Sequence, residues 1–181
     1  LMKGKGTGTR IDLTWDKVKG ATGYDVYWSY CNGKNNFNKL ANVPKSQKYA
    51  DKNLNNKKEY KYFTVAYKMS GGKKVYLGRT NTVHVAMPYA AKTNVLKVTV
   101  NKTKVNLAKG KTFKITKKVK LENSKKKALN HLTKKERFIT SNAKVATVSS
   151  AGVIKAVRKG TCTIYVMSEN GVCAKIKVTV K

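Results

Sequence analysis

The residues that could perform acid–base catalysis are few and scattered along the chain. The 181 residues include 8 acidic side chains and 2 histidines, against 40 lysines and arginines. Such catalysis needs two titratable groups held close together with different pKa values. Asp12 and Asp25 are expected to face outward on neighbouring strands, where ion pairing with lysines is their simplest role. Because His84 is expected at the surface of a strand and motifs such as G-x-S-x-G do not occur, the sequence predicts no catalytic site.

The three cysteines are predicted not to form a disulfide bond or a metal site. Cys162 alternates in phase with apolar Ile164, whereas Cys173 alternates in phase with Lys175, so the two thiols leave opposite faces of one hairpin. Cys31 lies in the other half of the chain, away from both of these cysteines. No C-x-x-C motif occurs and the two histidines fall in separate halves, so we expect neither a metal ion nor a cofactor.

Binding of a polyanion is the chemistry that the composition favours. The formal net charge is +32, and clustered cations attract polyanions with a strong dependence on salt. The densest cluster lies in segment 117–135, which is expected to be a basic loop with one helical turn. Its candidate residues are Lys117, Lys118, Lys120, Lys125, Lys126, Lys127, Lys134 and Lys135. Since lysines are spread over both halves, their simpler role is to keep the surface soluble and to protect strand edges.

Nucleic acid and membrane are not expected as partners. Only 4 of the 40 basic residues are arginines, the side chain best suited to reading bases. No segment approaches the roughly 20 apolar residues that cross a bilayer. The opening residues LMKGKGTGTR do not resemble a signal peptide. We therefore expect a monomeric internal piece of a longer exported protein, whose other domains are its partners.

The first half of the chain is predicted to be a sandwich of short strands. Polar and apolar residues alternate over 10–15 and 23–30, and the same pattern continues in the later strands 59–67, 74–77 and 81–85. Gly71-Gly72 fits the turn of a hairpin between two of them. Trp15, Tyr24, Trp28 and Tyr60 are expected in the core, although exposed aromatic rings in this half would suit a glycan.

The second half of the chain is predicted to contain short strands separated by only a few residues. Runs rich in Val, Ile and Thr cover 144–148, 152–157 and 161–166, each followed by a turn that contains glycine or is polar. Leu96, Val98 and Val100 are expected to point inward on its first strand, and Asn170-Gly171 to close its last hairpin. The predicted fold is all-β, with sandwiches at 1–88 and 95–181 joined by a short linker at 89–94.

Both halves resemble known families. The stretch TSNAKVATVSSAGVIKAVRKGTCTIYV, residues 140–166, resembles the bacterial immunoglobulin-like domain of group 2, and the likeness extends over about 95–181. The segments IDLTW and ATGYDVYW resemble strands of a fibronectin type III domain over about 8–86, with Leu54 and Tyr60 placed as in that fold's tyrosine corner. That domain's first strand should precede Thr9, where only LMKGKGTG is found.

These resemblances imply an extracellular setting. The group 2 domain builds surface proteins and secreted enzymes of bacteria, so the chain is expected to be secreted or attached to the cell wall. We expect a non-catalytic, stiff, basic spacer that displays another domain. One alternative is an adhesive module that binds anionic glycans or wall polymers through segment 117–135. Another is the accessory tail of a secreted enzyme that acts on carbohydrate or cell wall.

Overall fold

The computed structural model describes residues 1–132 and 137–181, and nearly all of its regular structure is β-strand. The chain divides into two compact units. The first unit contains Leu1–Asn94 with Asn123–Leu129, and the second contains Val95–Glu122 with Asn130–Lys181. The predicted all-β fold is confirmed. Residues 123–129, which the sequence analysis assigned to the second sandwich, belong to the first unit. Within the described ranges no helix is long and apolar enough to span a membrane.

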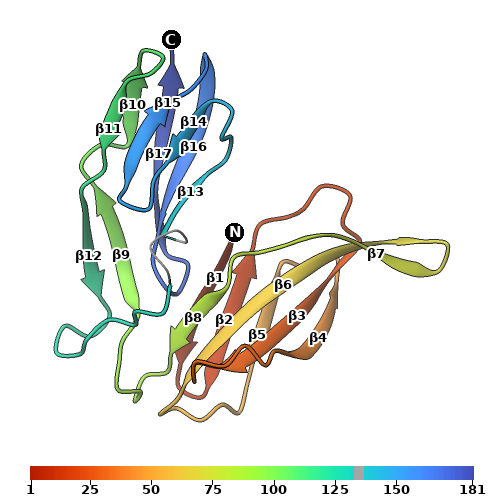
Figure 1. Ribbon diagram of the computed structural model, residues 1–181. Helices are drawn as coiled ribbons and strands as arrows, with labels where there is room; N and C mark the ends of the chain where they lie inside the picture. The colour runs from red at the N-terminus through yellow and green to blue at the C-terminus, as the bar shows by residue number, and fades with distance from the viewer. Residues whose placement is uncertain (133–136) are drawn as a thin grey trace. The chain divides into compact units, whose positions relative to one another are not determined.

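The first unit contains two sheets (Figure 1). The smaller sheet has the order β1-β2-β5, from Met2–Thr7, Arg10–Trp15 and Lys48–Asp51. The larger sheet has the order β4-β3-β6-β7, with β8 also paired to β6. Its strands are Asn38–Pro44, Gly23–Tyr30, Glu59–Ser70, Lys73–Arg79 and Val83–Ala86. Between the sheets lies a core of aliphatic and aromatic side chains: Met2, Ile11, Leu13, Trp15, Tyr24, Val26, Tyr60, Tyr62, Val83 and Val85.

The first strand, β1, is present, although the sequence pattern did not indicate it. It pairs with β2 along its whole length, and its inward positions are Met2, Gly4 and Gly6. Glycine is required there by close packing, because a Cβ atom on Gly4 would lie 2.5 Å from a methyl group of Val85. Two glycines at inward positions hide the apolar alternation by which a strand is recognised.

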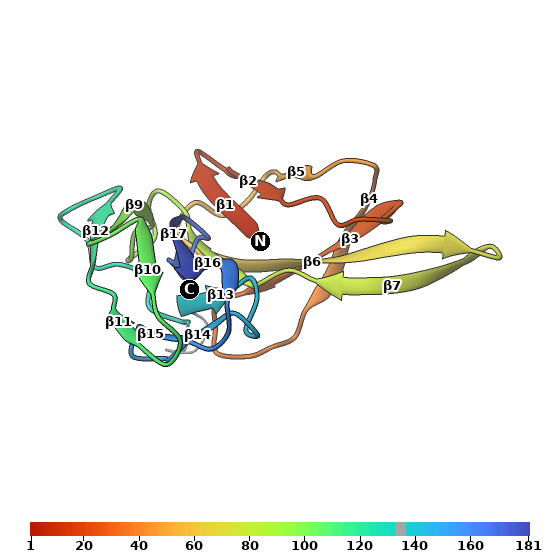
Figure 2. The ribbon, with the colours of Figure 1, turned by 90° about the horizontal axis from the view of Figure 1, so that it is seen from above.

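The tyrosine corner predicted at Tyr60 is confirmed. The Tyr60 hydroxyl accepts a hydrogen bond from the backbone N–H of Asn55 at 3.0 Å and donates one to its carbonyl oxygen at 3.5 Å. Both contacts hold the loop before β6 against the start of that strand. The Gly71-Gly72 turn between β6 and β7 is also present, with φ values of 56° and 74°. The β6–β7 hairpin extends beyond the rest of its unit (Figure 2).

The second unit contains three small sheets around one core. The strand orders are β10-β17-β16-β13, β11-β15-β14 and β12-β9. The strands, from β9 to β17, are Val95–Val100, Lys104–Leu107, Thr112–Lys114, Lys117–Leu121, Phe138–Thr140, Ala146–Val148, Val153–Ala156, Gly160–Met167 and Cys173–Val180. The three runs expected between 144 and 166 correspond to β14, β15 and β16. Their buried residues meet Ile176, Val178 and Val180 of β17 in the core.

The prediction of a loop at the start of segment 117–135 was wrong, because residues 117–121 form β12, paired to β9. The expectation that Leu96 points inward was also wrong. The register shifts so that Lys120 lies opposite Lys97 and Leu121 lies opposite Val95. This leaves Leu96 unpaired at a bulge with 52% of its surface exposed. A bulge adds one residue to a strand and reverses the alternation on one side of it.

The last hairpin joins β16 to β17 through residues 168–172, a loop longer than the two-residue turn expected at Asn170-Gly171. Gly171 has a φ of 82°, and the buried Asn170 side chain donates a hydrogen bond to the carbonyl oxygen of Val95. In the register of these strands Cys162 lies opposite Val178, and Cys173 lies opposite Met167. None of the three cysteines, all within the described ranges, forms a disulfide bond.

Substitution at Gly152 should separate backbone strain from steric overlap in the second unit. Gly152 has a φ of 76°, and an added Cβ would lie 2.8 Å from the Phe138 ring. Gly110 has a φ of 83° with no atom in reach of a Cβ. We expect Gly110→Ala to lower the free energy of unfolding by about 1 kcal/mol through strain alone. Gly152→Ala should lower it by about 2–4 kcal/mol, because the ring must also move.

Hydrogen exchange read by mass spectrometry on peptides from β15 would report the local opening free energy in both variants. Equal losses in the two variants would contradict the role assigned to the Phe138 ring.

Candidate anion-binding surfaces

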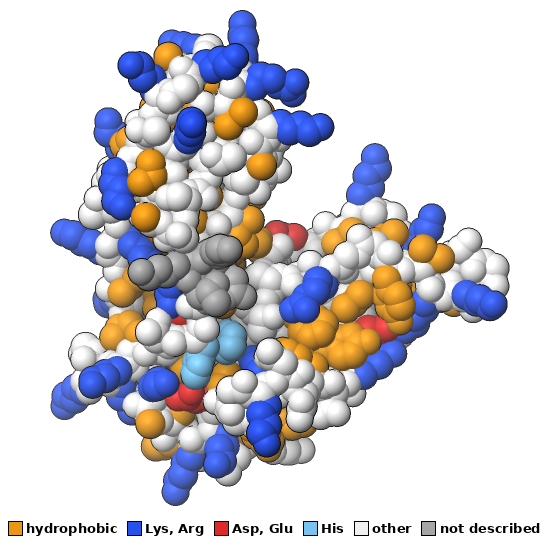
Figure 3. Space-filling view, viewed as in Figure 1, with side chains coloured by type: hydrophobic (Ala, Val, Ile, Leu, Met, Phe, Trp, Pro, Cys, Tyr) orange, Lys and Arg blue, Asp and Glu red, His pale blue; other side chains and the backbone are white. Residues whose placement is uncertain are grey.

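The lysines predicted to bind a polyanion are divided between the two units. Lys117, Lys118 and Lys120 lie on β12 in the second unit, whereas residues 125–127 belong to the first unit. Lys134 and Lys135 lie outside the described residues. Figure 3 shows lysine and arginine side chains spread over the visible surface of each unit rather than gathered in one area. Each group of cations is therefore considered within its own unit.

Lys118 and Lys120 share an outward face with a lysine that the sequence analysis missed. In the register of β12 and β9, Lys118 lies opposite Thr99 and Lys120 lies opposite Lys97. All three lysines are exposed. Like charges directly opposite each other destabilise a strand pair, and a bound anion would offset their repulsion.

Lys117 has a different environment from its neighbours on β12. It is half-buried, with its ammonium 5.5 Å from the centre of the Phe138 ring. Burial lowers the pKa of Lys117, and the nearby Arg137 charge lowers it further, while Glu169 acts in the opposite direction. Arg137 is itself bound to the buried Glu169 carboxylate at 2.9 Å. Lys117 therefore packs within a structural cluster and is poorly placed to meet a ligand.

Lys126 is also engaged by its own unit. Its ammonium donates hydrogen bonds to the carbonyl oxygens of Pro88 at 3.0 Å and Ala90 at 2.7 Å. Leu129, in the same segment, is buried against Ala86 and Ala90. These contacts attach residues 123–129 to the end of the first unit. The ammonium of Lys126 is thus used to hold the chain in place.

A further cationic surface is a shallow hollow on the outward face of the β10-β17-β16-β13 sheet. It has a volume of about 450 Å³ and is lined by Cys162, three lysines and several hydroxyl-bearing residues: Thr103, Lys104, Ser141, Thr161, Thr163, Lys175 and Lys177. Lys104 lies directly opposite Lys177 in the parallel pairing of β10 and β17. Ammonium and hydroxyl groups together are the donors that a phosphate or sulfate group requires.

Only part of this hollow could be anticipated from the sequence. Alternation along the last strand places Lys175 and Lys177 on its outward face, together with Cys173. The contribution of Lys104 depends on the parallel pairing of β10 with β17. No local pattern predicts that pairing, because the two strands are far apart in the sequence.

The carboxylates of the first unit serve the fold. Asp25 is fully buried on β3, not exposed on a strand beside Asp12 as expected, because β2 and β3 lie in different sheets. Its carboxylate contacts the ammonium groups of Lys74 at 2.8 Å and Lys39 at 3.0 Å, and the amide of Asn42 at 2.8 Å. Burial acts to raise the pKa of Asp25, but these hydrogen bonds outweigh it and the pKa lies below its ordinary value.

Asp51 has the opposite electrostatic balance. It is 8% exposed and accepts a hydrogen bond from the Tyr62 hydroxyl at 2.8 Å. Burial raises the pKa of Asp51, although the bonds from Tyr62 and the backbone of Lys52 act to lower it. Burial and the Asp51 charge also raise the pKa of Tyr62. Asp51 therefore resists ionisation, whereas Asp25 is stabilised as an anion.

The structure also pairs a cysteine with a histidine, which the sequence analysis did not anticipate. Cys31 follows β3 and His84 lies on β8, and both strands pair with β6. The Cys31 sulfur lies 3.3 Å from Nδ1 of His84. Both side chains are half-buried. No three His, Cys, Asp or Glu side chains of the described residues are grouped as a metal site would require.

Comparison with known proteins identifies one domain family. Residues 94–180 match the family model described as bacterial Ig-like domain (group 2). No curated protein gives a significant match. Among solved structures, the S-layer protein SbsC domains 4 and 5 is 18% identical with a TM-score of 0.36, and the alignment covers 97% of this chain and 84% of that one.

Two further structures are similar at lower identity. Chicken CNTN1 FN1-FN3 domains is 15% identical with a TM-score of 0.36, and the alignment covers 99% of this chain and 63% of that one. The S-layer protein rSbsC(31-844) is 13% identical with a TM-score of 0.31, and the alignment covers 99% of this chain and 41% of that one.

Asp25 and Asp51 should respond oppositely to replacement by Asn. A carboxyl group whose pKa is lowered by folding stabilises the fold at pH values above its unfolded pKa of about 3.9. That stability is lost as the pH falls through its folded pKa. Asp25→Asn should therefore cost about 1–2 kcal/mol at pH 7, with a difference from wild type that shrinks below about pH 4. A raised pKa stabilises the fold only at low pH, so Asp51→Asn should leave stability at pH 7 unchanged or higher.

Both tryptophans lie in the first unit, so urea unfolding followed by tryptophan fluorescence reports the unit that contains both acids. A loss at pH 7 that is equal in the two variants would contradict the assignment.

Proposed function

We propose that the chain, whose residues 94–180 match the family model of the bacterial Ig-like domain (group 2), is a non-catalytic extracellular module of a bacterial surface or secreted protein. Its role is to act as a basic spacer that displays other domains of the same polypeptide. Secretion or attachment to the cell wall is part of the same proposal.

The observation that supports a spacer is the construction of the chain from two units with separate cores. Each core is enclosed by strands of its own unit, so each unit can remain folded by itself. The buried carboxylates of the first unit are engaged in hydrogen bonds or ion pairs that hold strands together. The exposed lysines keep a long display structure soluble and repel other copies.

The spacer role can be tested by placing zero, one or two copies of the full chain between a wall anchor and an epitope tag on a bacterial surface. We expect antibody binding to the tag to rise with each copy, because each copy adds folded length. A flexible Gly/Ser linker of the same residue number is the control, since the span of a random coil grows only as about the square root of its residue number. Equal exposure of the tag in all three strains would contradict the spacer role.

A second function, binding of an anionic wall polymer or glycan, is supported by the hollow on the second unit. Three lysines line it together with hydroxyl-bearing residues around a volume of about 450 Å³. The hollow is a candidate beside segment 117–135, in which Lys117 and Lys126 make contacts within their own units while Lys118, Lys120, Lys125 and Lys127 are exposed. The spacer and the binding site are compatible, since a spacer held against the wall by charge still displays the domains attached to it.

Two triple variants with equal loss of charge distinguish this site from general attraction. The first combines Lys104→Gln, Lys175→Gln and Lys177→Gln, and the second combines Lys97→Gln, Lys118→Gln and Lys120→Gln. If the hollow binds wall teichoic acid, the first variant should weaken binding at about 0.15 M salt at least tenfold and the second by much less. Isothermal titration with purified teichoic acid and with heparin measures both. If the two variants weaken binding equally, the hollow is not a specific site and only the spacer role remains.

A further inference from the structure

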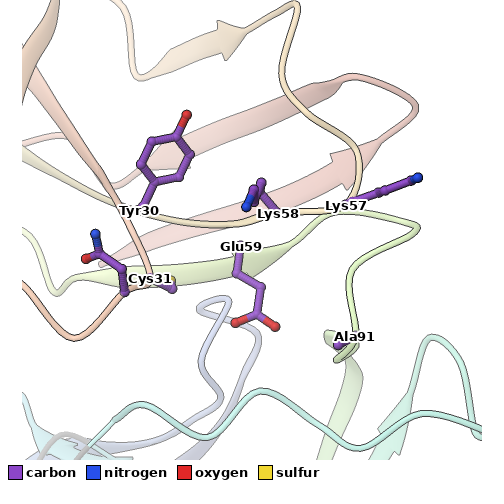
Figure 4. A pocket seen from close by; sticks show the side chains of 7 residues that line it. Tyr30, Cys31, Lys57, Lys58, Glu59 and Ala91 are labelled. Atoms are coloured by element: carbon purple, nitrogen blue, oxygen red, sulfur yellow. The ribbon is translucent and has the colours of Figure 1, made fainter.

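The Cys31–His84 pair lies beside a pocket in the first unit. The pocket has a volume of about 370 Å³, within the range of small-molecule sites. Its lining residues are Tyr30, Cys31, Asn32, Lys57, Lys58, Glu59 and Ala91. Figure 4 shows the Glu59 carboxylate and the Tyr30 ring directed to opposite sides of the sheet. The pocket combines a thiol with a carboxylate, two ammonium groups and an amide.

The strands around β6 fix the pair in place. Tyr30 at the end of β3 lies opposite Tyr60 on β6, and His84 on β8 lies opposite Lys61. The backbone N–H of Cys31 donates a hydrogen bond to the carbonyl oxygen of Glu59 at 3.0 Å, which continues the β3 pairing by one residue. The thiol is thus held at the end of an inner strand by a backbone contact, so its approach to His84 does not depend on a loose loop.

A histidine in contact with a thiol can accept its proton, and the thiolate is the form that reacts. The pocket also offers positive charge to a ligand. Lys57 and Lys58 line it and are exposed, and their ammonium groups suit a carboxylate. Small disulfides built from amino acids have carboxylates at their ends.

We propose that Cys31 is a site of reversible thiolation by a small disulfide that contains amino-acid groups, such as cystine or glutathione disulfide. His84 takes the thiol proton, and the Cys31 thiolate attacks one sulfur of the disulfide. A new S–S bond forms at Cys31 as the original S–S bond breaks. The departing thiolate takes up a proton from the imidazolium, so Cys31 is oxidised and one half of the small disulfide is reduced. The same exchange with a free thiol restores Cys31.

The other cysteines provide an internal control that needs no variant. Cys173 is half-buried like Cys31, and Cys162 is buried. With glutathione disulfide at pH 7, we expect Cys31 to be modified about five- to tenfold faster than Cys173. Mass spectrometry of proteolytic peptides after quenching measures all three rates in one sample. Similar rates at Cys31 and Cys173 would overturn the proposal, as would a Cys31–Cys31 dimer in place of the mixed disulfide.

His84→Gln tests the proton transfer, and unfolding followed by tryptophan fluorescence verifies that the variant is folded. We expect its rate at Cys31 to fall about fivefold at pH 7 and to approach the wild-type rate at pH 9, where a free thiol ionises unaided. An unchanged rate at pH 7 would show that His84 does not act on the thiol and would overturn the mechanism.

The pocket's recognition of the ligand is tested with a second disulfide. Bis(2-hydroxyethyl) disulfide has no charged groups, so it reports the intrinsic reactivity of Cys31. We expect Lys57→Gln with Lys58→Gln to lower the rate with glutathione disulfide about threefold and to leave the rate with the neutral disulfide unchanged. If the double variant lowers both rates equally, the pocket does not select amino-acid disulfides.

Discussion

The pairing of β6 with three other strands is the constraint on which the first unit depends. β3 covers one edge of β6, while β8 and β7 share the other edge. A strand that is paired on both edges has little freedom to slip. A shift of one residue would move Tyr60 and Tyr62 out of the core between the sheets and bring Glu59 and Lys61 into it. The bond between the Tyr60 hydroxyl and Asn55 fixes the start of the strand. The register of β6 therefore decides which of its side chains face the core. It also decides which residues of β3 and β8 become neighbours, and so brings Cys31 close to His84.

The scarcity of acids determines how charge is used in the rest of the protein. With 8 carboxylates for 40 cations, most lysines cannot find a partner and must remain in solvent. The acids that are buried are all engaged: Asp25 by Lys39 and Lys74, Asp51 by the Tyr62 hydroxyl, and Glu169 by Arg137 and the backbone N–H of Leu132. A buried ion pair contributes little net stability, but loss of one partner is costly because a charge remains unpaired. Loss of charge at Asp25 or Glu169 would therefore disturb the packing that these carboxylates maintain.

Local alternation predicted the parts of the fold in which one strand contains its own signal. Arg10–Trp15 and the runs between 144 and 166 form strands because apolar residues occur at every second position, and Tyr60 forms the expected corner. The prediction failed where the signal was absent or shifted. Gly4 and Gly6 replace apolar residues at inward positions of β1, and a bulge reverses the phase at Leu96. The lysine hollow and the Cys31–His84 pair depend on which distant strands become neighbours, a property that no single segment encodes.

The lysine hollow lies at outward positions of a sheet, and the Cys31 pocket is lined mostly by residues at strand ends and in loops. A physical reason favours both locations. Inward positions such as Ile176 and Val178 fill a packed core, where truncation costs about 2–5 kcal/mol. Outward substitutions usually change stability by less than about 0.5 kcal/mol, because water replaces the lost contacts. The pattern of buried residues therefore fixes the sandwich, while lysines, hydroxyls or a thiol can be exchanged on its faces without loss of register. A sandwich domain can acquire a binding surface or a reactive cysteine in this way, since neither requires any change in its core.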